Sequence, residues 1–205
     1  MVYVLSPLLG LVLGIISVFF AQGGIHRRSV FARAMHFGGA WRRQRVLTLC
    51  ASVAIGLYSA WLYGTWCREL VGLQLLCSYL LAASVTDLRG RRIPDDMSLF
   101  FAALFALWQV SSFSLTQLLS TVLGGVTGGL LLLVCHLARR EAIGLGDVKL
   151  LAVCGLITGF PGVLYVFVRA MVAIFIYSVV QLLRRRLNRG AQVPLAPFML
   201  FGALI

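Results

Sequence analysis

Residues 117–160 read QLLSTVLGGVTGGLLLLVCHLARREAIGLGDVKLLAVCGLITGF and contain two apolar segments separated by a short polar connection. The first segment, 117–138, has the length of about 20 residues that a helix needs to cross the hydrocarbon core of a bilayer. The second segment begins at Asp147 and runs to the Phe-Pro-Gly at 160–162, where a helix should end. This stretch therefore predicts two consecutive membrane helices.

The same alternation extends over the whole chain. Of its 205 residues, 60% are hydrophobic and 12% are charged, and the mean hydropathy is +0.97, whereas a soluble domain is about half apolar and a quarter charged. We predict an all-α, polytopic bundle with seven to eight transmembrane helices that forms one integral membrane domain over 1–205. The expected spans are 2–21, 46–65, 70–87, 97–115, 117–138, 147–160 and 163–183, with a short eighth at 193–205.

The distribution of arginine predicts the orientation of this bundle. Seven alternating spans with the N-terminus outside put fifteen arginines on the cytoplasmic side and leave only Arg68 and Arg169 elsewhere. Short cytoplasmic connections are enriched in Lys and Arg, so this bias favours an outside N-terminus and a basic cytoplasmic loop at 22–45. The net charge of +12 is accordingly interpreted as contact with anionic membrane lipid and not with nucleic acid.

Two of the six acidic residues, Asp87 and Asp147, lie at the ends of apolar segments. In the predicted orientation both are on the cytoplasmic side. Ionisable groups within membrane spans are costly and usually functional. If the two carboxyl groups meet, one can hold a proton while the other activates a water molecule, as in aspartic proteases. Taken alone, two separated carboxylates would be explained equally well as helix caps or as groups that reach the membrane interface.

The residues around the two aspartates are more specific than the aspartates themselves. GLGDVKL at 144–150 contains the GxGD motif of intramembrane aspartic proteases. Together with TDLRGRRIP at 86–94 and VPLAPFMLFGAL at 193–204, it resembles the type IV prepilin peptidase family. The resemblance covers about 85–205, and the three motifs follow the order found in the family.

This resemblance implies an aspartic endopeptidase in which Asp87 and Asp147 are the catalytic residues. The two glycines of the GxGD motif are expected to permit an unwound backbone at membrane depth. Lys149 lies two residues from Asp147, on another helical face. Its side chain is expected to extend toward the membrane interface and not to pair with Asp147. The residues that would shape the site are Gly144, Gly146, Lys149 and Pro94.

The family resemblance also implies the substrates and the location. These are prepilins of type IV pili or pseudopilins of type II secretion, cleaved at the cytoplasmic face of the bacterial inner membrane. No metal or organic cofactor is implied for the hydrolysis. The chain resembles a short form of the family, because 22–45 lacks the paired CxxC motifs of the longer, bifunctional members. We therefore predict cleavage without N-methylation of the mature N-terminus. Asp95 and Asp96, where the family often has Asn, are interpreted as helix N-caps.

Other patterns favour structural roles. The five cysteines form no CxxC pair, and the three histidines have no acidic neighbours at ligand spacing, so neither a zinc module nor a disulfide framework is predicted. The two overlapping GxxxG patterns in GGVTGG, 124–129, predict close packing between helices.

Three other functions remain compatible with the sequence. One is a different GxGD protease, such as a preflagellin peptidase or a presenilin-like enzyme, although Pro94 and the Pro-rich end of the chain favour the prepilin group. Another is a proton-coupled transporter in which Asp87 and Asp147 relay protons. Such a transporter should contain inverted repeats with two interrupted helices, and the sequence indicates a single interruption near Gly144. The third is a catalytically inactive assembly factor.

Overall fold

A computed structural model describes residues 2–21, 39–65, 67–90, 93–110, 114–138, 144–184 and 193–205. These parts of the chain form eight α-helices and contain no strand, so the all-helical class is confirmed. The helices are α1 (Val2–Ala21), α3 (Gly39–Tyr63), α4 (Arg68–Gly90), α5 (Asp95–Val110), α6 (Leu115–Ala138), α7 (Leu145–Thr158), α8 (Gly162–Leu183) and α9 (Ala196–Leu204).

The helix lengths partly support the predicted membrane crossings. Five of the described helices, α1, α3, α4, α6 and α8, are long and apolar enough to cross a bilayer. The segment predicted at 97–115 forms a shorter helix than expected, α5 with 16 residues, and the segment predicted at 147–160 forms α7, which has 14 residues. A straight crossing takes about 20 residues. The count of seven to eight spans and the outside N-terminus therefore stay predictions.

The predicted basic loop at 22–45 is wrong at its C-terminal end. Helix α3 already begins at Gly39, and residues 22–38 lie outside the described part of the chain. Arginine, glutamine and alanine are good helix formers. The basic sequence before the apolar segment can therefore continue the helix beyond the hydrocarbon.

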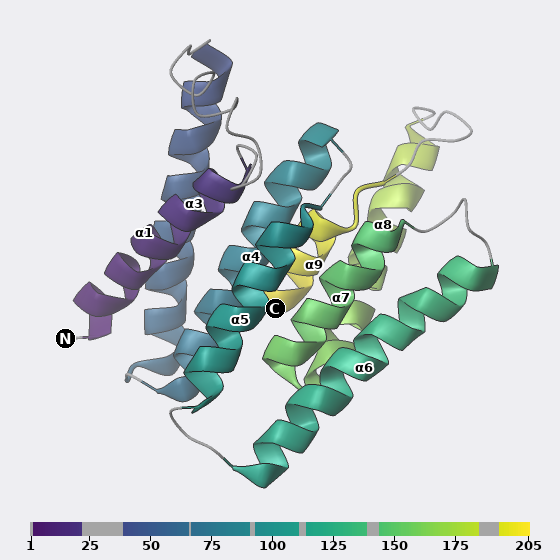
Figure 1. Ribbon diagram of the computed structural model, residues 1–205. Coiled ribbons are helices and arrows are strands. Elements are labelled where there is room, and N and C mark those ends of the chain that lie inside the picture. Colours follow the sequence, from purple (N-terminus) through teal and green to yellow (C-terminus); the bar gives the residue numbers. More distant parts are fainter. Residues whose placement is uncertain are drawn as a thin grey trace.

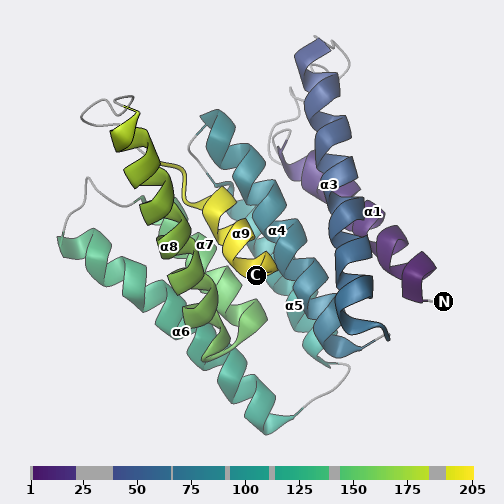
Figure 2. The ribbon, with the colours of Figure 1, turned by 180° about the vertical axis from the view of Figure 1, so that it is seen from behind.

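Helix α4 is the centre of the bundle (Figures 1 and 2). In its most apolar window 78% of the residues are buried, against 17–33% in the other four long helices. Helices α1 and α3 pack on one side of α4, while α6, α7 and α8 lie on the other. The outer helices therefore keep broad apolar faces that suit contact with lipid.

Glycines allow α6 and α7 to approach closely. A Cβ atom on Gly124 would lie 2.6 Å from the carbonyl carbon of Gly159, and one on Gly125 would lie 2.6 Å from Leu156. Real Cβ atoms essentially never come this close to other heavy atoms. The GxxxG prediction is confirmed. Without side chains at these positions, α7 can lie directly along α6.

Hydrogen bonds between buried polar side chains tie the N-terminal helices to α4. Ser6 Oγ of α1 donates to the Gly56 carbonyl of α3 at 2.6 Å. Gln74 Nε2 of α4 donates to the Ser6 carbonyl at 3.1 Å, and Ser59 Oγ of α3 donates to Gln74 Oε1 at 3.3 Å. Three helices therefore meet in one polar cluster inside the apolar bundle.

Candidate active site

Asp87 lies in the last turn of α4, and 8% of its surface is exposed. The neighbouring hydroxyl groups bond to their own helix: Ser84 Oγ donates to the Leu80 carbonyl at 2.6 Å, and Thr86 Oγ1 to the Ala83 carbonyl at 2.9 Å. These polar residues are thus accommodated within the buried helix. Asp87 is a carboxyl group in a position that is otherwise largely closed to solvent.

Asp147 lies in the first turn of α7 and is half-buried. Its backbone N–H donates to the Gly144 carbonyl at 3.1 Å. Its side chain turns back toward the same glycine, because a Cβ atom on Gly144 would lie 3.8 Å from Asp147 Oδ2. A carboxylate at this end of a helix is also favoured by the helix dipole.

The fold brings these two aspartates together. Helix α4 ends near the point where α7 begins, at the upper end of the bundle in Figure 1. The two side chains are close enough for the charge of Asp87 to act on Asp147. Residues sixty positions apart in the sequence therefore form one acidic site.

The backbone around the GxGD motif is more regular than expected. Gly144 precedes α7 in an extended conformation, with φ −75° and ψ 148°, but Gly146 lies inside the helix. The prediction of an unwound segment is therefore wrong for Gly146. Helical angles are as accessible to glycine as to other residues, and the hydrogen bond from Asp147 to Gly144 closes the first turn around it.

The connection between α4 and α5 covers the start of α7. A Cβ atom on Gly146 would meet the Ile93 side chain at 3.7 Å, which is an ordinary van der Waals distance. Pro94 directly precedes α5, and its carbonyl accepts a hydrogen bond from the Ser98 N–H at 3.3 Å. Sequence analysis singled out Pro94 but not Ile93, although Ile93 belongs to the same RRIP motif.

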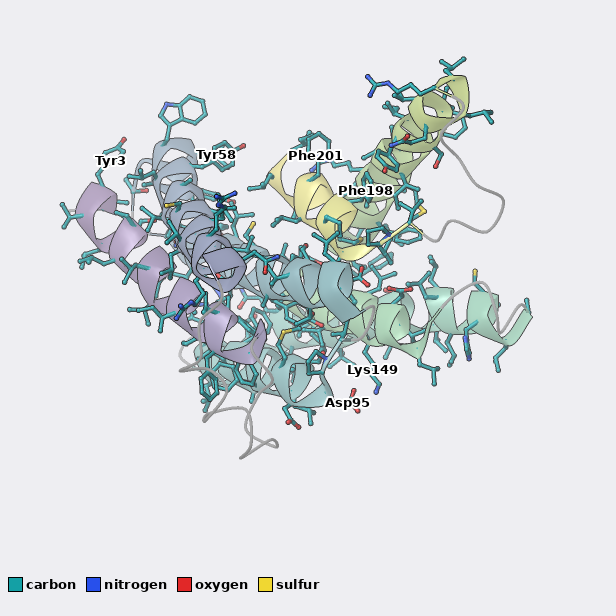
Figure 3. All side chains as sticks on the ribbon, turned by 90° about the horizontal axis from the view of Figure 1, so that it is seen from above. Tyr3, Tyr58, Asp95, Lys149, Phe198 and Phe201 are labelled. Atoms are coloured by element: carbon teal, nitrogen blue, oxygen red, sulfur yellow. The ribbon has the colours of Figure 1, made fainter. Side chains whose placement is uncertain are left out.

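Lys149 forms an ion pair with Asp95, with 2.6 Å between Nζ and Oδ1. The two side chains are 48% and 63% exposed, and they lie at the edge of the bundle in Figure 3. The partner of Lys149 is thus Asp95 and not Asp147, because the first turn of α5 lies beside α7. Asp95 and Asp96 are both in that first turn. The interpretation of Asp95 as an N-cap missed its contact with Lys149.

The third motif forms α9, a helix of nine residues with a proline in its first turn. At 1.5 Å per residue it is about 13 Å long, too short to cross a bilayer. A Cβ atom on Gly202 would lie 2.6 Å from the Val166 carbonyl, so α9 packs tightly against α8. At its end, Tyr58 Oη donates to the Leu204 carbonyl at 2.8 Å. The predicted short eighth segment is thus a helix that enters the bundle part of the way.

Among the described residues, no three His, Cys, Asp or Glu side chains gather in a way that could hold a metal ion. The metal-free reaction inferred from the family resemblance stays a prediction.

Comparison with known proteins identifies the family. Residues 74–179 match the type IV leader peptidase family. Three curated relatives are each named prepilin leader peptidase/N-methyltransferase. The Bacillus subtilis protein is 28% identical over 137 residues, which are 67% of this chain and 55% of the relative. The Pectobacterium carotovorum protein is 34% identical over 115 residues, 54% of this chain and 39% of the relative. The Escherichia coli K12 protein is 30% identical over 176 residues, 81% of this chain and 74% of the relative.

The chain thus spans about half the length of the first of these relatives and less of the second. No solved structure matches it. The family match covers α5, α6 and α7 and most of α4 and α8, and it includes both aspartates of the acidic site. The chain belongs to the type IV leader peptidase family.

Proposed function

We propose that this protein is an aspartic endopeptidase of the bacterial inner membrane. It removes the leader peptide from type IV prepilins or type II secretion pseudopilins at the cytoplasmic face. The observation that carries the proposal is the placement of Asp87 and Asp147, from α4 and α7, at one end of an apolar bundle, where the charge of Asp87 acts on Asp147. The names of the curated relatives point to the same class of substrate.

The two carboxyl groups share one proton in the reaction. Burying a charge is costly, so we assign the proton to Asp87, the more buried of the two. Ionised Asp147 takes a proton from water as the water oxygen attacks the peptide carbonyl. Asp87 donates its proton to the carbonyl oxygen and so stabilises the developing negative charge. Breakdown of the tetrahedral intermediate then transfers a proton to the leaving amine and breaks the C–N bond.

The site position suits a substrate that is itself partly in the membrane. In the orientation that the arginines predict, the acidic site is at the cytoplasmic end of the bundle, next to helices with apolar outer faces. An apolar substrate helix could lie along such a face and present the bond that follows its polar leader. N-methylation is not part of the proposal, because residues 22–45 contain neither carboxylates nor cysteines.

A direct test is cleavage by purified protein in detergent. The protein is incubated with a prepilin that carries its leader, and the product is identified by its mobility and by mass spectrometry of its new N-terminus. A preflagellin assayed in parallel distinguishes the alternative GxGD protease. Failure to shorten any of these substrates, by protein that remains folded, would contradict the proposal. Proton-driven solute uptake by reconstituted protein would favour the transporter.

A further inference from the structure

A cavity of about 460 Å³ lies at the end of the bundle away from the acidic site. It is lined by the first turns of α4, α6 and α8 and by the last turns of α5 and α7. Arg68 in its wall is nineteen residues before Asp87 on the same helix, which is about 28 Å at 1.5 Å per residue. We call this space the arginine cavity. The proposed hydrolysis makes no use of it.

The first arginine of this cavity, Arg68, bonds to two glutamine side chains. The Arg68 guanidinium donates to Gln117 Oε1 at 2.5 Å and also donates to Gln109 Oε1. Gln109 in turn donates from Nε2 to Thr121 Oγ1 at 3.1 Å. These bonds connect the start of α4 to α5 and α6 and fix the guanidinium in the wall of the cavity.

The second arginine, Arg169, lies inside α8, a candidate membrane span with a mean hydropathy of 2.3. It is seven residues from the start of the helix, or about 10 Å along it. Within the described part of the chain, Arg169 forms no ion pair. A cation at such a position is costly unless it faces a cavity or meets an anion. One carboxylate, the exposed Glu69, also lines the cavity, so the lining carries two positive charges and one negative charge.

The surroundings indicate what kind of anion would fit. Tyr63, Trp108 and Tyr165 line the cavity, and such rings are typical of the zone where a membrane meets water. Along α8 next to Arg169, Val168 and Val172 are more than half exposed. An anion with hydrocarbon chains could therefore place its charge in the cavity and its chains against α8.

We propose that the arginine cavity binds the phosphate group of an anionic phospholipid. Guanidinium groups donate two parallel hydrogen bonds to phosphate oxygens, which makes arginine well suited to this group. In the orientation that the arginines predict, the bound lipid belongs to the outer leaflet, on the side of the membrane opposite the acidic site. This proposal does not depend on the peptidase activity.

The test measures thermal unfolding of the purified protein in a neutral detergent by circular dichroism. Phosphatidylglycerol, phosphatidylcholine and sodium phosphate are titrated separately at matched phosphorus concentrations. Phosphatidylglycerol should raise the melting temperature of the natural protein, while phosphatidylcholine and sodium phosphate should have much smaller effects. Native mass spectrometry should show about one retained phosphatidylglycerol molecule per chain.

Three variants assign this effect to the cavity. Arg68→Gln and Arg169→Gln should each need about ten times more phosphatidylglycerol for the same rise, because each removes a charged hydrogen-bond donor. Arg184→Gln is the matched control, because it removes the same charge from an exposed position at the other end of α8. It should respond like the natural protein. Arg169→Lys, which keeps the charge but not the paired donors, should fall in between.

Measurements on the natural protein alone can contradict the proposal, even if a variant fails to fold. An equal rise in melting temperature with phosphatidylglycerol and with phosphatidylcholine would contradict it. A response to sodium phosphate without one to phosphatidylglycerol would show that the ligand is free phosphate and not lipid. An equal loss in Arg184→Gln would show that net charge, and not the cavity, attracts the lipid.

Discussion

Lys149 Nζ lies 2.6 Å from Asp95 Oδ1 and joins the first turn of α7 to the first turn of α5. Asp147 is two residues before Lys149, and the connection that contains Ile93 leads from Asp87 to Asp95. The ion pair therefore joins the helix that carries Asp147 to the helix that directly follows Asp87 in the chain.

Loss of this ion pair should lower the catalytic efficiency only slightly. Asp95→Asn and Lys149→Gln are each expected to lower kcat/KM by less than about fivefold, because exposed ion pairs contribute about 0–1 kcal/mol. The double variant should be no worse than either single variant. The effect should shrink in high salt, which screens exposed charges. A loss of a hundredfold or more in Asp95→Asn would instead give Asp95 a direct role in the reaction.

Asp87→Asn and Asp147→Asn should each reduce prepilin cleavage at least about a thousandfold, because an amide can neither take a proton from water nor replace the shared acid. Membrane insertion and melting temperature should change little. Asp96→Asn is the matched control, since Asp96 is an exposed acid in the first turn of α5, and it should retain most activity. Substantial cleavage by Asp147→Asn would show that the site has been assigned to the wrong residue.

Gly146 should tolerate one methyl group but not a branched side chain. A Cβ atom there meets Ile93 at an ordinary 3.7 Å, so Gly146→Ala is expected to keep cleavage within a few-fold of the natural rate. Gly146→Val adds two further carbon atoms with restricted rotamers, and these should push Ile93 and the α4–α5 connection away from α7. Its kcat/KM should fall at least about tenfold. Equal activity of the two variants would mean that the contact with Ile93 has no influence on the site.

The glycine contact between α6 and α7 should be sensitive to any added side chain. Gly124→Ala is expected to lower the melting temperature clearly, because overpacking a tight contact costs about 1–3 kcal/mol. Gly129→Ala provides a matched control on the same helix, since its new Cβ would lie 3.4 Å from the Ala152 Cβ, at the edge of ordinary contact. If both variants melt at the same temperature, the close approach of α6 and α7 contributes little to stability.

Cleavage should leave an unmodified N-terminus. Incubated with S-adenosylmethionine and a prepilin, the purified protein is expected to release a mature subunit with a free amino group. The basic segment 22–45 offers no carboxylate to bind a sulfonium ion or an ammonium group. Mass spectrometry distinguishes the outcomes, because methylation adds the mass of one CH₂. That addition, found with purified protein, would place a methyl-transfer site within the helical bundle.

The helices could be predicted from the sequence because each one coincides with an apolar segment of characteristic length. The observed ends differ most where polar residues continue a helix, as at Gly39 in α3, or where a helix stops early, as at Val110 in α5. In both cases local preference and packing, and not hydropathy, determine where the helix ends.

Asp87 and Asp147 could be singled out as candidate site residues because both lie in recognisable motifs. The pairing of Lys149 with Asp95 could not be predicted, since it depends on how two helix ends lie beside each other. The arginine cavity could not be predicted from the sequence either. Arg68 and Arg169 are about a hundred residues apart, and only the fold brings both to the lining of one cavity.

The close glycine contact between α6 and α7 also bears on when the proposed active site can form during synthesis of the chain. Helices α6 and α7 are neighbours in the chain, so they can pair as soon as both have left the ribosome. Asp147 comes close to Asp87 only when the α6–α7 pair packs against α4, which is synthesised earlier. A nascent chain that ends before α7 contains Asp87 but not Asp147. Proteolytic activity should therefore appear late in synthesis, after most of the bundle is already in the membrane.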